Sequence, residues 1–494
     1  MISSRRVVLL GFIAAAIVAL GFADLTGRHT DPSVLLARMA DGLLHPDFSI
    51  WPELFNGTML TAAFAVCGVF FGAGFGLLLA PLYHIRTVRT FCIAIRAIHE
   101  LFWALLLLNI TGLSPTTGVL AIGIPYTGIF AKVFSEYLDE ASRAPEAALP
   151  RKVGQITRLL WARLPQCVVP MRNYTLYRLE CGIRSSAVLG FIGLPTLGYL
   201  LETYFKQAHY DQAFAVLAIF LLLIIPVRRW MKWRLAPIYL LASLAVLVAQ
   251  KTPPMGSGMF ARFLHDIIPA PIRTGAEWSG WLEKVFVNQA WPGVVDTVVL
   301  SQIALTGAAL IAFFAFPAIV PRVAGRFGAM IGHLGLVLCR SLPEYMLAFV
   351  LLQFFGPSML PAILALALHN GAIIAHLLGR QATSLALRPD APTGLTLWGW
   401  ELVPRLSANF WALCLYRWEI IVRESAIMGI LGIGTLGFYI QKNVQELRLD
   451  RVVALLAVSF LLTMAIDQLS RRLRASMRVG TQLHIEGSRG NARR

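Results

Sequence analysis

Arginine and glutamate occur together inside apolar segments of this chain. Arg96 precedes Glu100 by four residues. Arg340 precedes Glu344 by the same distance, so the spacing predicts that each pair shares one face of a helix. An unpaired charge at mid-membrane costs at least about 2.5–3.5 kcal/mol on insertion scales, so such residues face a protein interior or a wet cavity. Either the two charges neutralise each other and lock helix packing, or they line an anion pathway, for which the planar guanidinium is suited.

A second group of arginines begins a phrase that occurs twice. The copies are IRSSAVLGFIGLPTLGY at 183–199 and VRESAIMGILGIGTLGF at 422–438. In each copy an arginine precedes a segment of small residues, which suits either the lining of an anion pathway or a packing seam. The residues concerned are Arg184, Ser186, Arg423 and Ser425.

The glycines of the same phrase allow two interpretations. Small residues at such spacings let membrane helices approach closely. Alternatively, they break the helix so that backbone N–H groups at a helix start face an anion. Proline replaces one glycine in the first copy, and proline disrupts a helix interior. We therefore expect a break or sharp turn, serving as a gate, at these positions: Gly193, Pro195, Gly198, Gly432, Gly434 and Gly437.

Other polar residues of the apolar segments predict structural roles. Salt bridges to other helices are expected for two further pairs, Arg178 with Glu180 and Arg417 with Glu419. His99 is isolated in the sequence, which is typical of a packed or hydrogen-bonded membrane histidine. The six cysteines are scattered without a CxxC pair, so no metal site is predicted.

The composition is that of an integral membrane protein. Hydrophobic residues make up 57% of the 494 residues, charged residues only 14%, and the mean hydropathy is +0.68, which is too apolar for a soluble chain of this length. The net charge of +17 lies in short basic clusters between apolar runs of roughly 16–29 residues, the pattern of membrane helices. We therefore expect an all-α, polytopic membrane protein without a nucleic-acid partner.

Twelve apolar runs fit one topology. The first, at about 7–23, follows Arg5 and Arg6 and is expected to be a retained membrane helix, because no clear signal-peptide cleavage site follows it. Basic clusters fall in every second loop, as the positive-inside rule requires, so both termini are expected in the cytoplasm. The other runs lie at about 57–82, 90–111, 116–135, 166–201, 212–227, 235–250, 293–320, 328–355, 358–379, 407–440 and 451–467.

The chain contains an internal repeat. Residues 177–201 match residues 416–440 at a constant offset of 239, with arginines, glutamates, serines and glycines in common. Because each half has an even number of spans, the two six-helix halves are parallel and related by a pseudo-twofold axis along the membrane normal. The expected halves are 1–235, with its core at 50–235, and 236–494, with its core at 290–475; residues 251–290 form an extracytoplasmic linker.

The sequence contains no motif for catalysis. GxxxxGK[ST], HExxH, GxSxG and paired-carboxylate patterns are absent. We expect no enzymatic activity and no cofactor in this chain. If transport uses ATP, a partner must bind it with Mg²⁺.

The segment KVFSEYLDEASRAPEAALPRKVGQITRLLWARLP at 132–165 resembles the EAA loop of ABC-importer permeases. That family's motif has Glu-Ala-Ala, then Gly at position seven and Leu-Pro at positions nineteen and twenty. The matching residues are Glu146, Ala147, Ala148, Leu164 and Pro165, while Lys152 occupies the glycine position. In the second half Pro404 matches, but Leu385-Ala386-Leu387 lacks the glutamate.

Within that superfamily the chain is most similar to phosphonate-importer permeases. The patterns are R-x-I/L-x-E in the third span, then YR-x-E and R-x-S-A-x-x-G-x-x-G-x-x-T-L-G, and they occur in both halves. The resemblance implies two permease units of the type I importer fold fused in tandem in a bacterial inner membrane. It also implies a homodimeric cytoplasmic ATPase that docks on the EAA loop and a periplasmic binding protein for a phosphonate, phosphite or phosphate-like oxyanion. Transport would be inward, by alternating access.

An ion-coupled secondary transporter with parallel internal repeats is the competing hypothesis. It predicts membrane carboxylates that titrate during transport, and Glu100 and Glu344 suit that role. The EAA-to-LP spacing favours the ABC importer.

Overall fold

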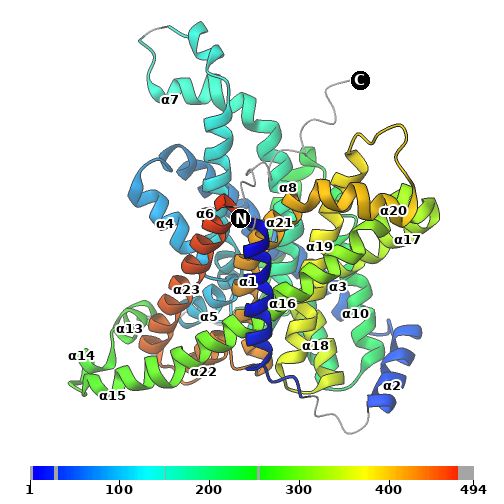
Figure 1. Ribbon diagram of the computed structural model, residues 1–494. Helices are drawn as coiled ribbons and strands as arrows, with labels where there is room; N and C mark the ends of the chain where they lie inside the picture. The colour runs from blue at the N-terminus through cyan, green and yellow to red at the C-terminus, as the bar shows by residue number, and fades with distance from the viewer. Residues whose placement is uncertain (1–3, 27–31, 151, 253–255, 257, 477–494) are drawn as a thin grey trace. The chain divides into compact units, whose positions relative to one another are not determined.

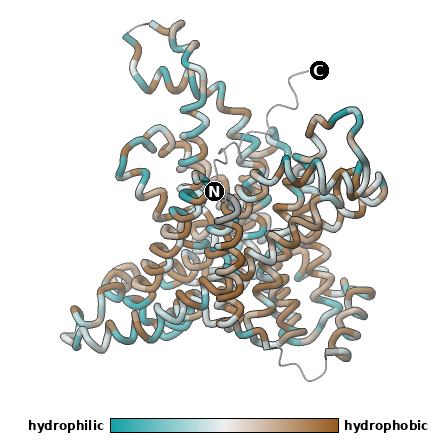
Figure 2. The backbone as a smooth tube through the Cα atoms, in the orientation of Figure 1, coloured by the Kyte–Doolittle hydropathy of each residue, from teal (hydrophilic) through white to brown (hydrophobic). Residues whose placement is uncertain are grey.

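The computed structural model describes residues 4–26, 32–150, 152–252, 256 and 258–476. The residues in these ranges form helices and no strand. Figure 2 shows apolar residues along the long helices and polar residues gathered at the loops. The prediction of an all-α, polytopic membrane protein is confirmed. The extreme ends of the chain, at 1–3 and 477–494, for which a cytoplasmic location is predicted, lie outside the described residues.

The candidate membrane spans among the described residues fall into three groups: single long helices, bent helix pairs and shorter apolar helices. Four helix pairs pass the test only together, because each is bent by more than 40° at a short break. Three shorter apolar helices cover Leu9–Leu20, Tyr210–Ile224 and Trp233–Val248. The count of twelve spans stays a prediction. The five single long helices are Trp51–Leu82, Pro115–Glu140, Trp278–Ile319, Met359–Ser384 and Leu449–Ser476.

The chain forms two compact units. The first unit covers Gly42–Phe263, and the second unit combines Met1–Asp41 with Leu264–Arg489. These boundaries differ from the predicted halves at 235/236, because the first helix of each predicted half packs on the core of the other half. Helix α1 (Ser4–Leu20) runs beside α16 (Trp291–Ala315) in the second unit (Figure 1). Helix α12 (Ala236–Val248) packs on α3 (Trp51–Leu79) in the first unit.

The first unit holds the following elements besides α3 and α12: η1 (Ala80–Leu82), α4 (Arg86–Ala97), α5 (Glu100–Thr111), α6 (Pro115–Glu140), η2 (Ala144–Ala148), α7 (Gln155–Arg158), η3 (Leu159–Arg163), α8 (Leu164–Val188), η4 (Leu189–Ile192), α9 (Leu197–Lys206), α10 (Tyr210–Ile224), α11 (Val227–Trp230) and η5 (Trp233–Leu235). Helices α2 (Pro32–Leu44) and α13 (Met259–Asp266) cross the boundaries between the units.

Besides α1, the second unit begins with the linker elements α14 (Ala270–Thr274), α15 (Trp278–Leu282) and η6 (Glu283–Ala290). The series that matches the first unit follows and consists, besides α16, of η7 (Phe316–Ile319), α17 (Pro321–Ser341), α18 (Glu344–Phe355), α19 (Met359–Ser384), α20 (Gly394–Leu397), η8 (Trp398–Leu402), α21 (Val403–Met428), η9 (Gly429–Leu431), α22 (Leu436–Gln445) and α23 (Leu449–Ser476).

Small residues let the central helices of each unit approach closely. Helix α3 packs along α6, and a Cβ on Gly72 of α3 would lie 2.6 Å from the Cβ of Tyr126. In the second unit the glycine is on the other partner: a Cβ on Gly371 of α19 would lie 2.9 Å from the Cβ of Ile311 in α16. Such close helix approach is the usual packing solution in membranes, where burial from water contributes little.

A buried aspartate holds the linker to the second unit. Asp450, in the first turn of α23, accepts hydrogen bonds from the backbone N–H of Ala270 at 3.1 Å and from Trp281 Nε1 at 2.7 Å. These donors belong to the start of α14 and to α15. The described part of the predicted linker 251–290 is therefore largely helical, and α14 and α15 are held on α23; its residues 253–255 and 257 lie outside the described ranges.

Candidate functional site

Each unit contains a sharp bend where the sequence predicts an uninterrupted helix. Helices α4 and α5 meet at 93°, and α17 and α18 meet at 92°. The prediction that Arg96 and Glu100 share one helix face is therefore wrong, because Arg96 lies in the last turn of α4 and Glu100 begins α5. Arg340 and Glu344 flank the second bend in the same way.

Local chemistry explains both bends. In the second unit Pro343 precedes α18, and a proline pushes the residue before it into an extended conformation, as seen at Leu342 with φ −69° and ψ 126°. In the first unit His99 takes the position of the proline. Its Nδ1 accepts a hydrogen bond from the N–H of Leu101 at 3.2 Å, which caps α5.

The first bend brings Glu100 to α8. Ser185 donates its hydroxyl to Glu100 Oε1 at 2.5 Å, and His99 Nε2 lies 3.4 Å from Oε2. The glutamate side chain is 19% exposed. Glu100 is therefore held by a hydroxyl and an imidazole at the start of a helix, where the helix dipole favours a carboxylate.

The second bend gives its glutamate different neighbours. His369 Nε2 of α19 lies 3.8 Å from Glu344 Oε2. Glu424 of α21 occupies the repeat position of Ser185, and Asn370 Nδ2 donates to Glu424 Oε2 at 3.0 Å. Sequence reasoning assigned no role to Ser185, His369 or Glu424; only the repeat alignment relates Ser185 to Glu424.

The two serines predicted to line the anion pathway are buried against their own helices, unlike the arginines predicted for the same pathway. Ser186 and Ser425 are fully buried, and each donates to its own helix, to the carbonyls of Ile183 at 2.8 Å and Val422 at 2.7 Å. Their hydroxyls thus serve the helix backbone. Arg184 of α8 is half-buried and donates from Nη2 to Cys181 Sγ at 3.6 Å.

Arg423 on α21 and the two arginines at the bends, Arg96 and Arg340, are half-buried as well. All four predicted lining arginines therefore keep partial exposure, unlike the serines. Partial exposure is what a guanidinium needs in order to meet a solute, and it is also common for an arginine in a packed ion pair.

Two arginines expected in salt bridges to other helices are stabilised otherwise. The Arg178 guanidinium carbon lies 5.2–5.9 Å from the ring centroids of three tyrosines, and its Nε donates to Tyr174 Oη at 2.8 Å. Such stacking attracts a cation without an ionised partner. Arg417, at the repeat position, donates instead to Asn370 Oδ1 at 3.2 Å. The three tyrosines are Tyr126, Tyr174 and Tyr177.

Both units have a break at the predicted glycines. The 3₁₀ segments η4 and η9 end at Gly193 (φ +94°) and Gly432 (φ +84°), in the left-handed region that favours glycine. The following helices turn by 51° and 47°. Pro195 is exposed in the break of the first unit, and a Cβ on its counterpart Gly434 would lie 2.8 Å from Asp296 Oδ2.

The remaining glycines of the phrase allow backbone contact. A Cβ on Gly198 would collide with the carbonyl oxygen of Ala187, and one on Gly437 would collide with that of Ala426. Helices α9 and α22 thus lie against the ends of α8 and α21 at a distance that only glycine permits.

The first amide of each helix after the break already has a partner. The N–H of Leu197 donates to Thr61 Oγ1 of α3 at 2.9 Å, and the N–H of Leu436 donates to Thr297 Oγ1 of α16 at 3.1 Å. These two amides do not face an anion, so the expectation of an anion-binding helix start does not apply to them.

An ion pair closes the predicted EAA loop of the first unit. Glu146, in η2, accepts from Arg163 Nε at 2.5 Å across 17 residues. The hydrogen bond to the Arg163 guanidinium holds the pKa of Glu146 below its usual value. The other predicted coupling residues lie along the same loop: Ala147 and Ala148 end η2, Lys152 is exposed in a turn, and Leu164 and Pro165 begin α8.

The corresponding loop of the second unit has an ion pair of opposite polarity. Here the N-terminal side supplies the cation: Arg388 donates to Glu401 Oε1 from Nε at 2.9 Å and from Nη2 at 2.5 Å. Arg405 lies 3.4 Å from Glu401 Oε2. Hydrogen bonding to Glu401 raises the pKa of Arg388. Pro404 begins α21 just as Pro165 begins α8.

The glutamate that sequence reasoning found missing from the second loop therefore has a substitute on its far side. The motif count predicts the glutamate among residues 385–387, whereas Glu401 lies sixteen residues after Leu385. The motif specifies a glutamate at one position, so it does not match a loop in which the two charges have changed places. The signal in the sequence that could have found this pair is the presence of opposite charges on the two sides of the loop.

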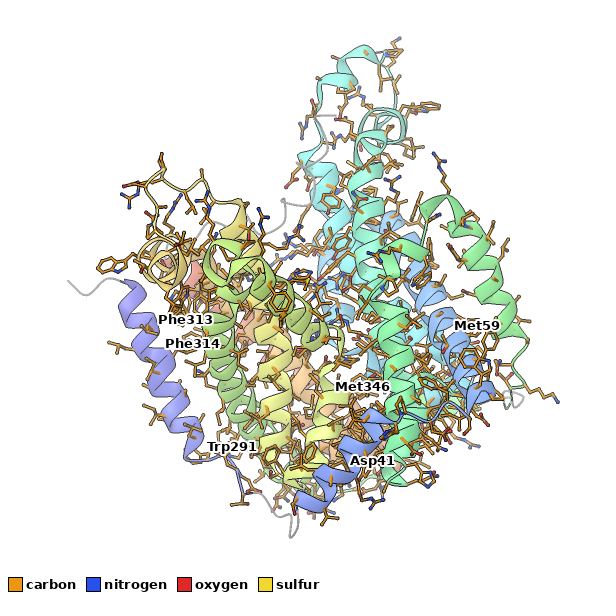
Figure 3. The ribbon with its side chains drawn as sticks, turned by 90° about the vertical axis from the view of Figure 1, so that its right-hand side faces the viewer. Asp41, Met59, Trp291, Phe313, Phe314 and Met346 are labelled. Carbon is orange, nitrogen blue, oxygen red and sulfur yellow. The ribbon has the colours of Figure 1, made fainter. Side chains whose placement is uncertain are left out.

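Both loops expose an aliphatic residue and a tryptophan in the same register. Ile156 and Trp161 are each 74% exposed in the first loop, and Leu395 and Trp400 are 75% and 81% exposed in the second. An aromatic contact holds the second loop against α16: the ring centroid of Trp398, in the loop, lies 5.2 Å from that of Phe313, in α16. Figure 3 shows Phe313 and Phe314 at one end of α16 and Trp291 at the other.

Searches against known proteins find relatives among import permeases. The chain is 25% identical to the phosphate-import permease protein PhnE of Mycolicibacterium smegmatis over 431 residues, covering 79% of this chain and 77% of that protein. It is 27% identical to the phosphite transport system permease protein PtxC of Stutzerimonas stutzeri over 199 residues, 38% of this chain but 72% of that protein. It is 28% identical over 102 residues, 20% of this chain and 84% of the relative, to PhnE2 of Escherichia coli K12, named for cryptic phosphonate transport.

No family model matches the chain, and no solved structure matches it. The relatives are named for phosphate, phosphite or phosphonate transport, which confirms the resemblance predicted from the loop and repeat motifs. The chain is thus a multi-pass membrane protein that is similar to permeases of phosphate, phosphite and phosphonate import systems.

Proposed function

We propose that this chain is the transmembrane permease of an ABC importer that moves a phosphorus oxyanion, a phosphonate, phosphite or phosphate, into a bacterial cell. A separate homodimeric ATPase supplies the energy through ATP and Mg²⁺. A periplasmic binding protein delivers the anion to the chain, which lies in the inner membrane with both termini in the cytoplasm. The printed names of the relatives support the substrate class.

The observation that carries this proposal is the pair of loops. Each is closed by an ion pair, Glu146 with Arg163 or Glu401 with Arg388. Each exposes a tryptophan beside that ion pair. Exposed aromatic residues on a braced loop are typical anchors for a protein partner. A dimeric ATPase offers two equivalent docking sites, so two braced loops suit it better than one.

The half-buried arginines at the bends and breaks are the proposed lining of the anion pathway. Arg96 and Arg184 serve the first unit, and Arg340 and Arg423 serve the second. A guanidinium binds an oxyanion through paired N–H donors. The carboxylates of Glu100 and Glu344 would keep these arginines from holding the anion too tightly, as transport requires release.

Reconstitution tests the function directly. We would place the chain in proteoliposomes with the ATPase and binding protein encoded beside it, and measure uptake of phosphite, methylphosphonate and phosphate. ATP-dependent uptake of at least one of them is expected. Uptake that persists without the ATPase and follows a proton gradient would identify an ion-coupled secondary transporter instead, with Glu100 and Glu344 as the titrating carboxylates.

Copurification with the ATPase tests the docking surface. Trp161→Ala, Trp400→Ala and Glu146→Lys are each expected to weaken recovery of the ATPase. Trp291→Ala is the matched control, because that tryptophan is 69% exposed at the far end of α16. Equal loss in the control, or none in the loop variants, would show that the tryptophans lie in the lipid headgroup region and do not bind the ATPase.

A further inference from the structure

Three potential metal ligands come together in the second unit. Glu344 at the start of α18, His369 of α19 and Glu424 of α21 each place one donor atom within 4.8 Å of the other two. We propose that these residues bind a divalent cation such as Zn²⁺ or Mn²⁺. The site belongs to the second unit by itself, so the proposal does not depend on what the protein transports.

The donor set suits such an ion. One imidazole nitrogen with two carboxylates is a combination found for Zn²⁺ and other first-row divalent metals. Zinc bonds of about 2.0–2.2 Å place tetrahedral ligand atoms about 3.3–3.6 Å apart. His369 Nε2 and Glu344 Oε2 lie 3.8 Å apart, and all three donor atoms lie within 4.8 Å of one another, close to that separation.

The surroundings orient the donors as they do around bound metals. His369 Nδ1 lies 2.8 Å from the carbonyl oxygen of Leu342. Since a carbonyl only accepts, Nδ1 carries the hydrogen, and a neutral His369 turns the lone pair of Nε2 toward Glu344. Asn370 donates to Glu424 at 3.0 Å and is itself held by Arg417. Partners of this kind fix the tautomer of a ligating histidine and the orientation of a ligating carboxylate.

Burial makes a cation favourable at this place. His369 is 1% exposed and Glu344 is 8% exposed. In such a place of low dielectric constant, a cation shared by the three donor atoms would be attracted strongly by the carboxylates.

The first unit provides an internal contrast. Glu100 is present there, but Ser185 stands at the position of Glu424, and the residue 25 positions after Glu100 is Pro125, whereas the residue 25 positions after Glu344 is His369. The imidazole near Glu100 comes from His99, whose Nδ1 accepts a hydrogen bond and so leaves the hydrogen on Nε2. That nitrogen faces Glu100 as a donor and has no lone pair for a metal. The proposal therefore predicts one ion per chain.

A cation at this site would join three helices at a bend. Its ligands come from the first residue after the 92° turn and from two helices packed beside it. Metal binding would thus hold α18 against α19 and α21. Three protein ligands also leave a coordination position for water or an oxyanion oxygen.

Metal binding to the purified full chain tests the proposal. After chelator treatment in detergent, the chain is titrated with Mn²⁺ and followed by electron paramagnetic resonance, and its zinc content is measured after incubation with Zn²⁺ and desalting. One ion per chain is expected. Glu424→Ser, which copies the first unit, and His369→Gln should each weaken binding at least about tenfold. Wild-type Tm should rise on metal addition, and Tm of both variants should not.

His376→Ala is the matched control. His376 and His333 form another imidazole pair in the second unit, with ring centroids 5.2 Å apart, and this variant should bind metal as the wild type does. If Glu424→Ser does not fold, Glu424→Gln keeps the shape and replaces it in the same assay. Binding that survives both ligand variants, or that disappears with His376→Ala, overturns the proposal. So does a chain that binds no ion.

Discussion

The two units share their backbone geometry and differ in their charges. Their bends measure 93° and 92°, and their breaks turn by 51° and 47°. Threonines at matching positions, Thr61 and Thr297, cap the helix after each break. The ion pair that closes each loop, by contrast, has opposite polarity in the two units, Glu146 with Arg163 against Arg388 with Glu401.

The same contrast holds at the buried arginines. Arg178 rests among tyrosine rings, whereas Arg417 donates to Asn370. A close backbone contact admits only glycine, and a buried N–H needs an acceptor at one place, so few sequences satisfy either requirement. A charge can be stabilised by a ring, an amide or an ion of opposite sign. As the two repeats diverge, the close backbone contacts and the helix caps are therefore kept, whereas the partners of the charged residues change.

The largest effect is expected from adding a methyl group at the shared backbone contacts. Gly198→Ala and Gly437→Ala would drive a Cβ into a carbonyl oxygen, and such overpacking costs about 1–3 kcal/mol or more. Both variants should lose most of the folded protein recovered by gel filtration in detergent. Gly399→Ala, which has nothing within 4 Å of the added Cβ, should not. A large effect in one unit alone would break the comparison.

The ion pairs of the loops should give the next largest effect. Glu401→Gln should lower ATPase copurification more than Glu146→Gln, because Glu401 is bound by two arginines and is the less exposed carboxylate, at 7% against 17%. The double change Glu146→Arg with Arg163→Glu gives the first loop the polarity of the second and should retain binding. Loss of binding in that double variant would mean that the ATPase contacts the Glu146 carboxylate directly.

The threonine caps should give matched, smaller losses. Thr61→Val and Thr297→Val keep the side-chain shape but leave a buried N–H without its acceptor, which costs about 1–3 kcal/mol. The two variants should lower Tm by similar amounts. Thr58→Val is the control, since Thr58 donates to the carbonyl of Leu54 within its own helix. Unequal losses would show that the two breaks are not equivalent.

The smallest effect is that of pH on the first loop. The pKa of Glu146 is lowered by Arg163, so the ion pair contributes fully above the ordinary glutamate pKa of about 4.3. That contribution is lost only as pH falls through the lowered pKa of the folded state. ATPase binding measured by copurification should stay constant from about pH 8 to pH 5.5. A decline within that range would mean that another group controls docking.

The sequence by itself determined the membrane class, the repeat, the two breaks and the position of the first EAA-like loop. Each of these depends on residues close together in the chain: an apolar run, a glycine at a helix end, a motif with fixed spacing. The bend after Arg340 was also within reach, because Pro343 marks it locally, although the four-residue spacing suggested one continuous helix.

Only the tertiary structure decided which side chains meet. Ser185 reaches Glu100 across 85 residues, and His369 and Glu424 approach Glu344 from two other helices. The first helix of the chain likewise packs on the core formed by its last third, with the ring of Phe12 5.4 Å from that of Trp418. Local patterns encode helices, but the contacts between helices depend on the packing of the whole unit. Because the surfaces of all these helices are similarly apolar, the type of a residue does not indicate which helix it will contact.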